Sequence, residues 1–384
     1  MGIYLLLLTG IFILGTFFKS SIFGDKQGTR LFLDTSFILI FLLCALRSYT
    51  VGRDLPGYRM HYLDVVNHPW TNFNYIYFEK GYQLLMKVCA WIGLSWQMYL
   101  ALVYVIILIP IYMFIKKYSR NAFLSVIVFI CYMYFEFNLT AVRQAIAASI
   151  CLLAYMVLLE SKYKPIIKYI VLVTVAVFMH KSAFAAFSLL PFLWIRNIKL
   201  ASVLIALMSV GGIAVRSTVL SYIKLVFMKD SLNPDANLYF GGNLVFLLAL
   251  ATLFVLVEVT REKNTRKKLK PPNKAYKMYN AIVNHNHNRD GVILNYDYQN
   301  VFARSFLLSI FFMVLFGMDT SARSYMILNQ VIIISLPNTL EQFEEKLRHF
   351  IIVGVVAFML MFFYTNSIVP NNFDIIPYQF FWKN

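Results

Sequence analysis

Residues 96–115 read WQMYLALVYVIILIPIYMFI and contain no charged side chain. This stretch is long enough to cross the hydrocarbon core of a bilayer, which takes about 20 helical residues. Lys116 and Lys117 follow it directly, and basic residues next to an apolar stretch are typical of the cytoplasmic end of a membrane helix. The segment therefore predicts a membrane-spanning helix that ends in the cytoplasm.

The rest of the chain repeats this pattern. Of its 384 residues, 60% are hydrophobic and only 14% are charged, which is more apolar surface than a soluble globule can bury. Apolar windows predict about twelve spans. They are 2–18, 31–46, 96–115, 121–137, 142–160, 166–180, 182–195, 198–216, 241–259, 300–318, 324–337 and 349–366. We expect an all-α, polytopic transmembrane bundle that forms a single membrane domain over residues 1–384.

The basic residues predict how the chain is oriented. A net charge of +17 would suggest nucleic acid in a soluble protein, but most Lys and Arg residues lie in short segments between apolar windows. If these segments and the basic loop 261–299 face the cytoplasm, both termini lie outside. Residues 47–95 then form an outer loop, in which 72–94 lies on the membrane surface as an interfacial helix because a span cannot hold its charges. We expect the bilayer, and no nucleic acid, as a partner.

The sequence contains little evidence for a metal site or for a disulfide bond. His285 and His287 stand close together in the basic loop, which alone is weak evidence for a metal site, and the four cysteines show no CxxC spacing. Structural metal sites usually combine four such ligands. We expect no metal and no cofactor.

Charged residues also remain at the predicted outer ends of the spans, where the positive-inside rule does not explain arginines. They are Arg47, Arg53, Asp54, Glu79, Glu136, Arg143, His180, Lys181, Arg216 and Arg323. Any one arginine there is equally well explained as a snorkelling side chain. Arg143, Lys181 and Arg323 are predicted at helix starts, where free N–H groups attract phosphate. Taken together, the set favours a diphosphate held by arginine forks near the membrane surface.

Acidic and aromatic residues accompany these cations. Asp54 and Glu79 supply carboxylates. The aromatic residues of the outer loop are Tyr49, Tyr58, Tyr62 and Tyr82. Their rings offer faces on which sugars stack, although tyrosines are also common in the interfacial belt of any membrane protein.

Five motifs in a fixed order resemble the EpsG/Wzy-like family of polysaccharide repeat-unit polymerases. They are Val51-Gly-Arg-Asp with Tyr58, Glu79 with Gly81-Tyr82, Val142-Arg-Gln-Ala-Ile-Ala-Ala-Ser, His180-Lys-Ser-Ala and Ala322-Arg-Ser-Tyr, spread over residues 45–337. The resemblance implies a metal-independent, GT-C-like glycosyltransferase in the bacterial inner membrane. Its active site would face away from the cytoplasm and would extend O-antigen, capsule or exopolysaccharide chains.

The resemblance also implies partners and residue roles. Donor and acceptor would both be glycans linked to undecaprenyl diphosphate, and a chain-length regulator and a flippase are further expected partners. We expect Glu79, Asp54 or His180 to act as the base, and the residues leave open which of them takes the proton. The expected substrate contacts are Arg47, Arg53, Arg143, Arg323, Gln144, Tyr58, Tyr82, Lys181 and Tyr325.

Other functions remain open at this stage. An O-antigen ligase would use similar outer arginines. A flippase for lipid-linked oligosaccharides would need charges near the middle of the bilayer and often shows internal repeats, neither of which stands out in this sequence. A membrane acyltransferase would use His180 as its base, and a scaffold would have no need for the outer charges. The sugar, the linkage, the stereochemical outcome and the oligomeric state are not encoded in recognisable motifs.

Overall fold

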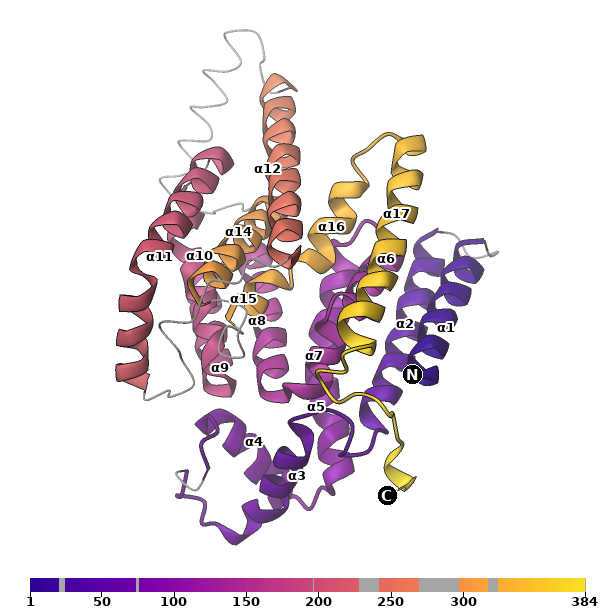
Figure 1. The fold of residues 1–384 in the computed structure, drawn as a ribbon, viewed down its shortest axis with the longest axis vertical. Helices are drawn as coiled ribbons and strands as arrows, with labels where there is room; N and C mark the ends of the chain where they lie inside the picture. Colours follow the sequence, from indigo (N-terminus) through magenta and orange to yellow (C-terminus); the bar gives the residue numbers. More distant parts are fainter. Residues whose placement is uncertain are drawn as a thin grey trace. The chain divides into compact units, whose positions relative to one another are not determined.

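The computed structural model describes residues 1–20, 25–73, 76–195, 197–227, 242–268, 297–316 and 324–383. Within these residues the regular structure is helical, and the only extended pairing is an isolated bridge between Arg47 and Phe380 (Figure 1). A helix satisfies its own backbone hydrogen bonds, as an apolar chain in lipid must. The all-α prediction is confirmed for this part of the chain.

The chain divides into two compact units. Unit 1 comprises Met1–Leu153, Leu172–Ala183 and Ile332–Asn384, and unit 2 comprises Ala154–Val171 and Phe184–Val331. The predicted single domain 1–384 is thus built from two units, and helices α8 (Val142–Glu160) and α9 (Pro165–Met179) each contribute residues to both.

Unit 1 combines the N-terminal helices with the C-terminal segment Ile332–Asn384. Besides parts of α8 and α9, its helices are α1 (Gly2–Ser20), α2 (Asp25–Ala45), α3 (Leu55–Asp64), η1 (Val65–Asn67), α4 (Lys80–Trp91), α5 (Trp96–Tyr118), α6 (Ala122–Cys131), α7 (Tyr134–Thr140), α16 (Ile332–Leu340), α17 (Glu345–Phe363), η4 (Tyr364–Ile368) and η5 (Phe381–Lys383). Helix α2 packs against α1 and α5, and α6 packs against α16 and α17. These contacts bury the apolar faces of helices that are far apart in the sequence.

Unit 2 is built around a buried helix. Its elements are η2 (Lys181–Ser188), α10 (Leu189–Leu193), α11 (Ile198–Phe227), α12 (Gly242–Lys268), α14 (Tyr298–Phe316) and α15 (Ser324–Asn329), of which η2 begins in unit 1. Helix α14 packs against α11, α12 and α15. The buried Ser305 hydroxyl lies 2.6 Å from the Tyr155 hydroxyl and donates to the Leu328 carbonyl at 2.9 Å. Polar links of this kind hold membrane helices together where water is absent.

Twelve spans are not confirmed. Among the described residues six helices are long and apolar enough to cross a membrane, or seven if α6 and α7, bent by 50°, count as one span. The six are Lys26–Ala45, Trp96–Tyr118, Val142–Glu160, Ile198–Tyr222, Tyr298–Phe316 and Glu345–Ile368. Several other windows form shorter helices: window 324–337 divides into α15 and α16, and window 182–195 into η2 and α10. Window 241–259 overlaps the longer helix α12, which continues to Lys268. Apolarity is a local property, whereas the place where a helix breaks depends on its packing partners.

The two ends of unit 1 carry different contacts. At one end the Tyr118 carbonyl accepts a hydrogen bond from the Asn338 amide at 2.8 Å, beside Lys116 and Lys117. At the opposite end the Tyr4 hydroxyl donates to the Ile375 carbonyl at 2.9 Å, so the N-terminal helix and the C-terminal segment meet there. This agrees with the alternation that the basic loops predict, while the membrane face that each end meets stays a prediction.

Within the predicted interfacial helix of residues 72–94, the helical part among the described residues is Lys80–Trp91, which forms α4. A further short helix of the outer loop, α3, precedes it, and both lie at the lower edge of Figure 1. Helix α4 leaves Leu84, Val88 and Trp91 exposed, and residues spaced in this way share one face of a helix. An apolar stripe on a short helix supports the interfacial position, which stays a prediction. Most of the predicted basic loop 261–299 lies outside the described residues.

Helix α4 begins against the C-terminal end of α9, and a glycine permits this contact. A methyl group added at Gly81 would lie 2.7 Å from the Phe178 carbonyl oxygen, whereas one added at Gly57 in α3 would meet no atom within 4 Å. Because backbone cannot yield as a flexible side chain does, Gly81 is required for the close approach.

Gly81→Ala is expected to destabilise the protein by about 1–3 kcal/mol, the usual cost of inserting a group into a packed contact. Gly57→Ala is its matched control and is expected to be neutral or slightly stabilising, because alanine favours helix. Thermal unfolding in detergent measures both. Equal melting temperatures for the two variants would contradict the close contact of α4 with α9.

Candidate functional site

Two side chains of α4 hold the loop that leads into it. The Gln83 amide nitrogen lies 3.0, 3.3 and 2.6 Å from the carbonyl oxygens of Phe73, Ile76 and Phe78. One turn later the Lys87 ammonium donates to the carbonyls of Pro69, Trp70 and Asn72 at 2.6, 3.2 and 2.6 Å. Both side chains are buried, and burial lowers the pKa of Lys87. A loop with its carbonyls bound in this way has a defined path, which determines where Glu79 lies.

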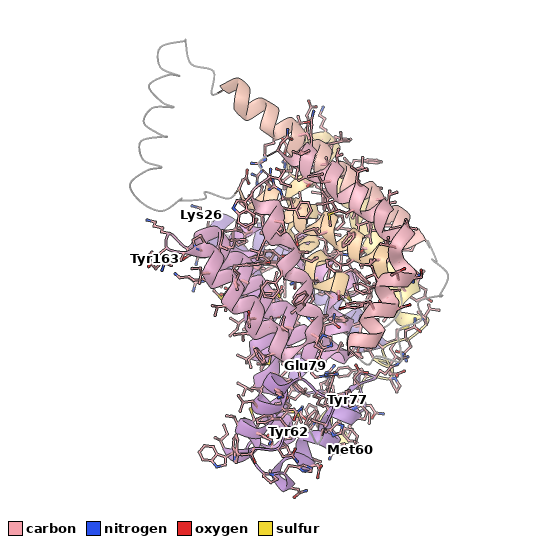
Figure 2. All side chains as sticks on the ribbon, turned by 90° about the vertical axis from the view of Figure 1, so that its left-hand side faces the viewer. Lys26, Met60, Tyr62, Tyr77, Glu79 and Tyr163 are labelled. Atoms are coloured by element: carbon pink, nitrogen blue, oxygen red, sulfur yellow. The ribbon has the colours of Figure 1, made fainter. Side chains whose placement is uncertain are left out.

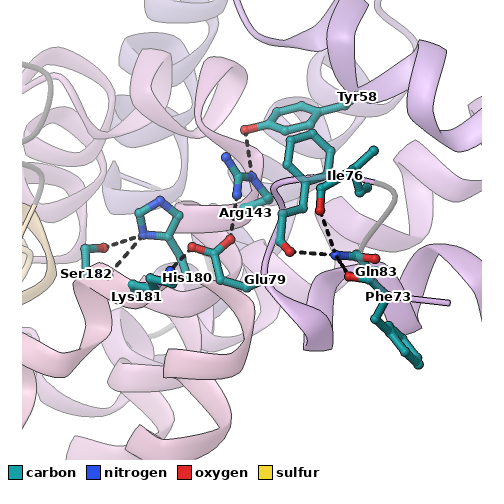
Figure 3. Close-up of polar contacts among 10 residues, drawn as sticks. Tyr58, Phe73, Ile76, Glu79, Gln83, Arg143, His180, Lys181 and Ser182 are labelled. Carbon is teal, nitrogen blue, oxygen red and sulfur yellow. Dashed lines mark hydrogen bonds and ion pairs between the residues drawn. The ribbon is translucent and has the colours of Figure 1, made fainter. Parts of the chain in front are cut away.

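Glu79 and Arg143 form the centre of the candidate site (Figure 3). Glu79 immediately precedes α4, and Arg143 is the second residue of α8. Arg143 Nη1 lies 2.5 Å from Glu79 Oε2, and the side chains are only 14% and 10% exposed. Short, charge-assisted hydrogen bonds of this kind are strong when water is largely excluded.

Aromatic rings surround the Arg143 guanidinium. Its central carbon lies 4.2 Å from the ring centre of Phe78, 5.7 Å from that of Tyr58 and 5.6 Å from that of Tyr77. The Tyr58 hydroxyl is 3.5 Å from Arg143 Nε. Ring faces attract a cation and keep water away from it. These contacts therefore hold the Arg143 guanidinium in a position where it can bind an anion.

The carboxylate of Glu79 occupies the position where the sequence predicts phosphate. Its second oxygen, Oε1, accepts a hydrogen bond from the backbone N–H of Lys181 at 3.2 Å, at the start of η2 (Figure 3). The anion thus bridges a guanidinium and a helix N-terminus, which are the two groups that commonly bind phosphate in proteins. The arrangement is therefore suited to hold an anion, and a substrate phosphate would compete with Glu79 for it.

His180 lies beside this pair and ends α9, as the sequence predicts from the break at His180-Lys181-Ser182. Its Nδ1 lies 2.7 Å from the Ser182 hydroxyl and accepts the Ser182 backbone N–H at 3.2 Å. Lys181 contributes its backbone to Glu79, while its side chain is exposed. In the part of the chain that the structure describes, no three His, Cys, Asp or Glu side chains are grouped as metal ligands.

Arg47 is buried away from solvent. It is 0% exposed, and its Nη2 donates to the Tyr104 hydroxyl at 2.6 Å, which donates in turn to the Asn138 carbonyl at 2.8 Å. Its Nε and Nη1 have no hydrogen-bond partner within the described residues. A substrate would reach this guanidinium only after Arg47 or its covering segments moved.

Arg53 lies at the surface and pairs with the C-terminal segment. Arg53 Nε is 3.1 Å from Asp374 Oδ2, and both side chains are 55% exposed. The backbone N–H groups of Gly52 and Arg53 donate to the carbonyls of Asp374 and Phe373 at 2.8 and 2.9 Å. The structure therefore separates Arg53 from Arg143 and gives it a partner about 320 residues away that no local pattern indicates.

The remaining predicted residues divide between the two units. Tyr58, Tyr82 and Gln144 are buried in unit 1, and Asp54 is the residue before α3 and is half-buried. Tyr82 packs its ring 5.7 Å from that of Tyr58, and burial raises the pKa of its hydroxyl.

Other predicted residues lie elsewhere. Tyr325 belongs to α15 in unit 2, and Arg323 lies outside the described residues. Of the other outer charges, Glu136 is buried in α7, and Arg216 donates to the Leu315 carbonyl in unit 2 at 3.1 Å.

Sequence reasoning misses several residues that build the site. Phe78 stands beside Glu79 in the sequence, and its ring lies against Arg143. Tyr77 precedes it and is 81% exposed, and Figure 2 labels it in the same part of the molecule as Glu79. His61 lies one turn after Tyr58 in α3, and its ring is 4.9 Å from that of Phe78. The signal for His61 is its i, i+3 spacing from Tyr58.

The ion pair also contributes to stability. Removing one member of a buried pair leaves an uncompensated charge, so Arg143→Met is expected to destabilise the protein by about 3 kcal/mol. Glu79→Gln keeps an acceptor for the Lys181 N–H and is expected to cost less. In the double variant the loss is expected to be smaller than the sum by about 1–3 kcal/mol. Thermal unfolding in detergent of the four proteins gives this coupling energy, and strictly additive losses would show that the pair does not form.

Comparison with known proteins gives one match. A family model described as "EpsG family" matches residues 30–380, a region that contains every described residue of the site. Neither the curated proteins nor the solved structures contain a match, so the GT-C-like resemblance stays a prediction. The family match spans most of the chain, together with apolar helices that are long enough to cross a membrane: the protein is a multi-pass membrane protein of the EpsG family.

Proposed function

We propose that this protein polymerises oligosaccharide repeat units carried on undecaprenyl diphosphate, at the extracytoplasmic face of the bacterial inner membrane. Membership of the EpsG family supports a membrane polysaccharide polymerase. The lipid donor, the membrane face and the roles of the residues are our inference. The observation that carries it is the ion pair of Glu79 and Arg143, an anion held by a guanidinium and a helix start at the end of unit 1 opposite Lys116 and Lys117.

The first step is an exchange of anions at Arg143. A lipid diphosphate carries more negative charge than a carboxylate and offers several oxygen atoms to the planar guanidinium fork. When it binds Arg143, it displaces Glu79. Because the buried rings of Phe78 and Tyr58 keep water away from Arg143, the cation stabilises the leaving diphosphate more strongly than it would in bulk water.

The second step uses the carboxylate that the exchange releases. The acceptor sugar hydroxyl attacks the anomeric carbon of the donor glycan and forms the new glycosidic bond. The bond from that carbon to the diphosphate oxygen breaks, and the diphosphate leaves with the electron pair. The hydroxyl proton passes to Glu79, whose oxygen atoms are free to accept it once the ion pair with Arg143 has opened. Asp54 and His180 are the other candidates for the proton, and His180 directly precedes Lys181, whose backbone N–H donates to Glu79.

Arginine at position 143 is expected to be needed for rate as well as for binding. Purified protein in liposomes with lipid-diphosphate-linked repeat units is expected to form ladders of increasing glycan length. Arg143→Gln removes the charge and is expected to lower kcat/KM by roughly a hundredfold or more, as the loss of a preorganised electrostatic donor does. Arg143→Lys keeps the charge but loses the planar guanidinium fork, so its kcat/KM is expected to lie between those of Arg143→Gln and the unaltered protein.

Arg348→Gln is the matched control. Arg348 pairs with Glu341 at 3.1 Å in unit 1, near the end that carries Lys116 and Lys117, and its loss is expected to leave ladder formation unchanged. Normal ladders in Arg143→Gln would refute the role of Arg143. The same experiment separates the alternatives, because a flippase moves labelled lipid without a new glycosidic bond, and a ligase makes a single transfer to a different acceptor.

A further inference from the structure

Tyr77 presents an open aromatic face next to the ion pair. It is 81% exposed, and its ring meets that of Phe78 edge to face at 4.8 Å. The tyrosines that the sequence suggests for stacking lack such a face: Tyr58, Tyr62 and Tyr82 are buried, and the Arg59 guanidinium lies 4.2 Å from the ring of Tyr49. Tyr77 is therefore the tyrosine of the described outer loop that has a free ring beside Arg143.

His61 lies close to the rings of Tyr77 and Phe78. Its imidazole lies 4.9 Å from the Phe78 ring and 6.5 Å from the Tyr77 ring, in each case nearly perpendicular to it. The side chain is half-buried, and within the described residues no group hydrogen-bonds to either ring nitrogen. Burial lowers the pKa of His61, Asp64 on its own helix opposes this effect, and Arg143 of α8 adds to it. At neutral pH the ring is therefore neutral and has one donor and one acceptor nitrogen.

These two side chains match the two surfaces of a sugar. A pyranose has a face of C–H groups, which packs against an aromatic ring, and a rim of hydroxyl groups, which a neutral imidazole satisfies. Arg143 lies near this pair, because its guanidinium is 5.6 Å from the Tyr77 ring centre and 4.2 Å from that of Phe78, and the His61 ring is 4.9 Å from the same Phe78 ring. A sugar bonded to a diphosphate would therefore meet Tyr77 and His61 when its diphosphate meets Arg143.

We propose that Tyr77 and His61 form a saccharide-binding subsite, in which Tyr77 stacks on the sugar next to the diphosphate and His61 hydrogen-bonds to its hydroxyl groups. This inference rests on the proposed function for its substrate class. These two residues bind the sugar, while Glu79 accepts the proton in the transfer step. Loss of either side chain therefore raises KM and leaves kcat nearly unchanged.

The test measures saccharide binding separately from polymerisation. The probe is the lipid-free repeat-unit oligosaccharide, released by partial hydrolysis of the polysaccharide from cells that express this protein. Saturation-transfer NMR on the full-length protein in detergent gives its affinity, and the liposome ladder assay gives KM and kcat. Tyr77→Leu is expected to weaken affinity and raise KM by about tenfold. Tyr77→Phe, which keeps the ring, is expected to bind nearly as the unaltered protein does.

His61→Gln and His61→Leu complete the set. Glutamine keeps a donor and an acceptor and is expected to retain most of the affinity, whereas leucine keeps only bulk and is expected to lose it. Met60→Leu changes the exposed neighbour of His61 and is expected to leave affinity unchanged. Unaltered affinity and KM in both Tyr77→Leu and His61→Leu would overturn the subsite. If the unaltered protein binds the oligosaccharide through Tyr77 but forms no ladders, the subsite stands and the polymerase function fails.

Discussion

The ion pair of Glu79 and Arg143 joins three segments that the chain separates. It links the loop before α4 to the start of α8, and the second oxygen of Glu79 adds the start of η2. A carboxylate that is 10% exposed and a guanidinium that is 14% exposed each need a partner, because an isolated charge is costly to bury. The rest of unit 1 provides the conditions for this contact: Gly81 lets α4 approach α9, and Gln83 and Lys87 bind the carbonyls of Phe78 and Pro69.

Arg47 and Arg53, two other arginines predicted on the outer side, have partners of their own in unit 1. Arg47 bonds to Tyr104 inside unit 1, and Arg53 bonds to Asp374 at its surface. The C-terminal segment runs along the turn from Arg47 to Arg53, where the Ser48 N–H donates to the Gln379 carbonyl at 2.8 Å and the Phe381 N–H to the Leu46 carbonyl at 3.0 Å. In the described structure Arg47 and Arg53 therefore order this turn, and Arg143 stands as the arginine of the anion site.

An anion site already occupied by the protein's own carboxylate has a chemical consequence. While Glu79 is bound to Arg143, each neutralises the other, and neither is free for catalysis. A diphosphate on Arg143 would change both groups at once, since the cation would face the leaving group and the carboxylate would be free to accept a proton. Under the proposed function, donor binding and activation of the base would thus be a single event, with the sugar directed toward Tyr77 and His61.

The sequence by itself determined the membrane class and the helical fold. These follow from the length of apolar stretches and the spacing of basic residues, which are local properties of the chain. The break at His180 is also local, and it was predicted. Only the tertiary structure decided which charges pair, because the partners of Arg143, Arg47 and Arg53 lie 64, 57 and 321 residues away. It likewise decided which tyrosines keep an open face and how many windows form full-length spans, because burial and helix breaks depend on neighbours that no stretch of sequence contains.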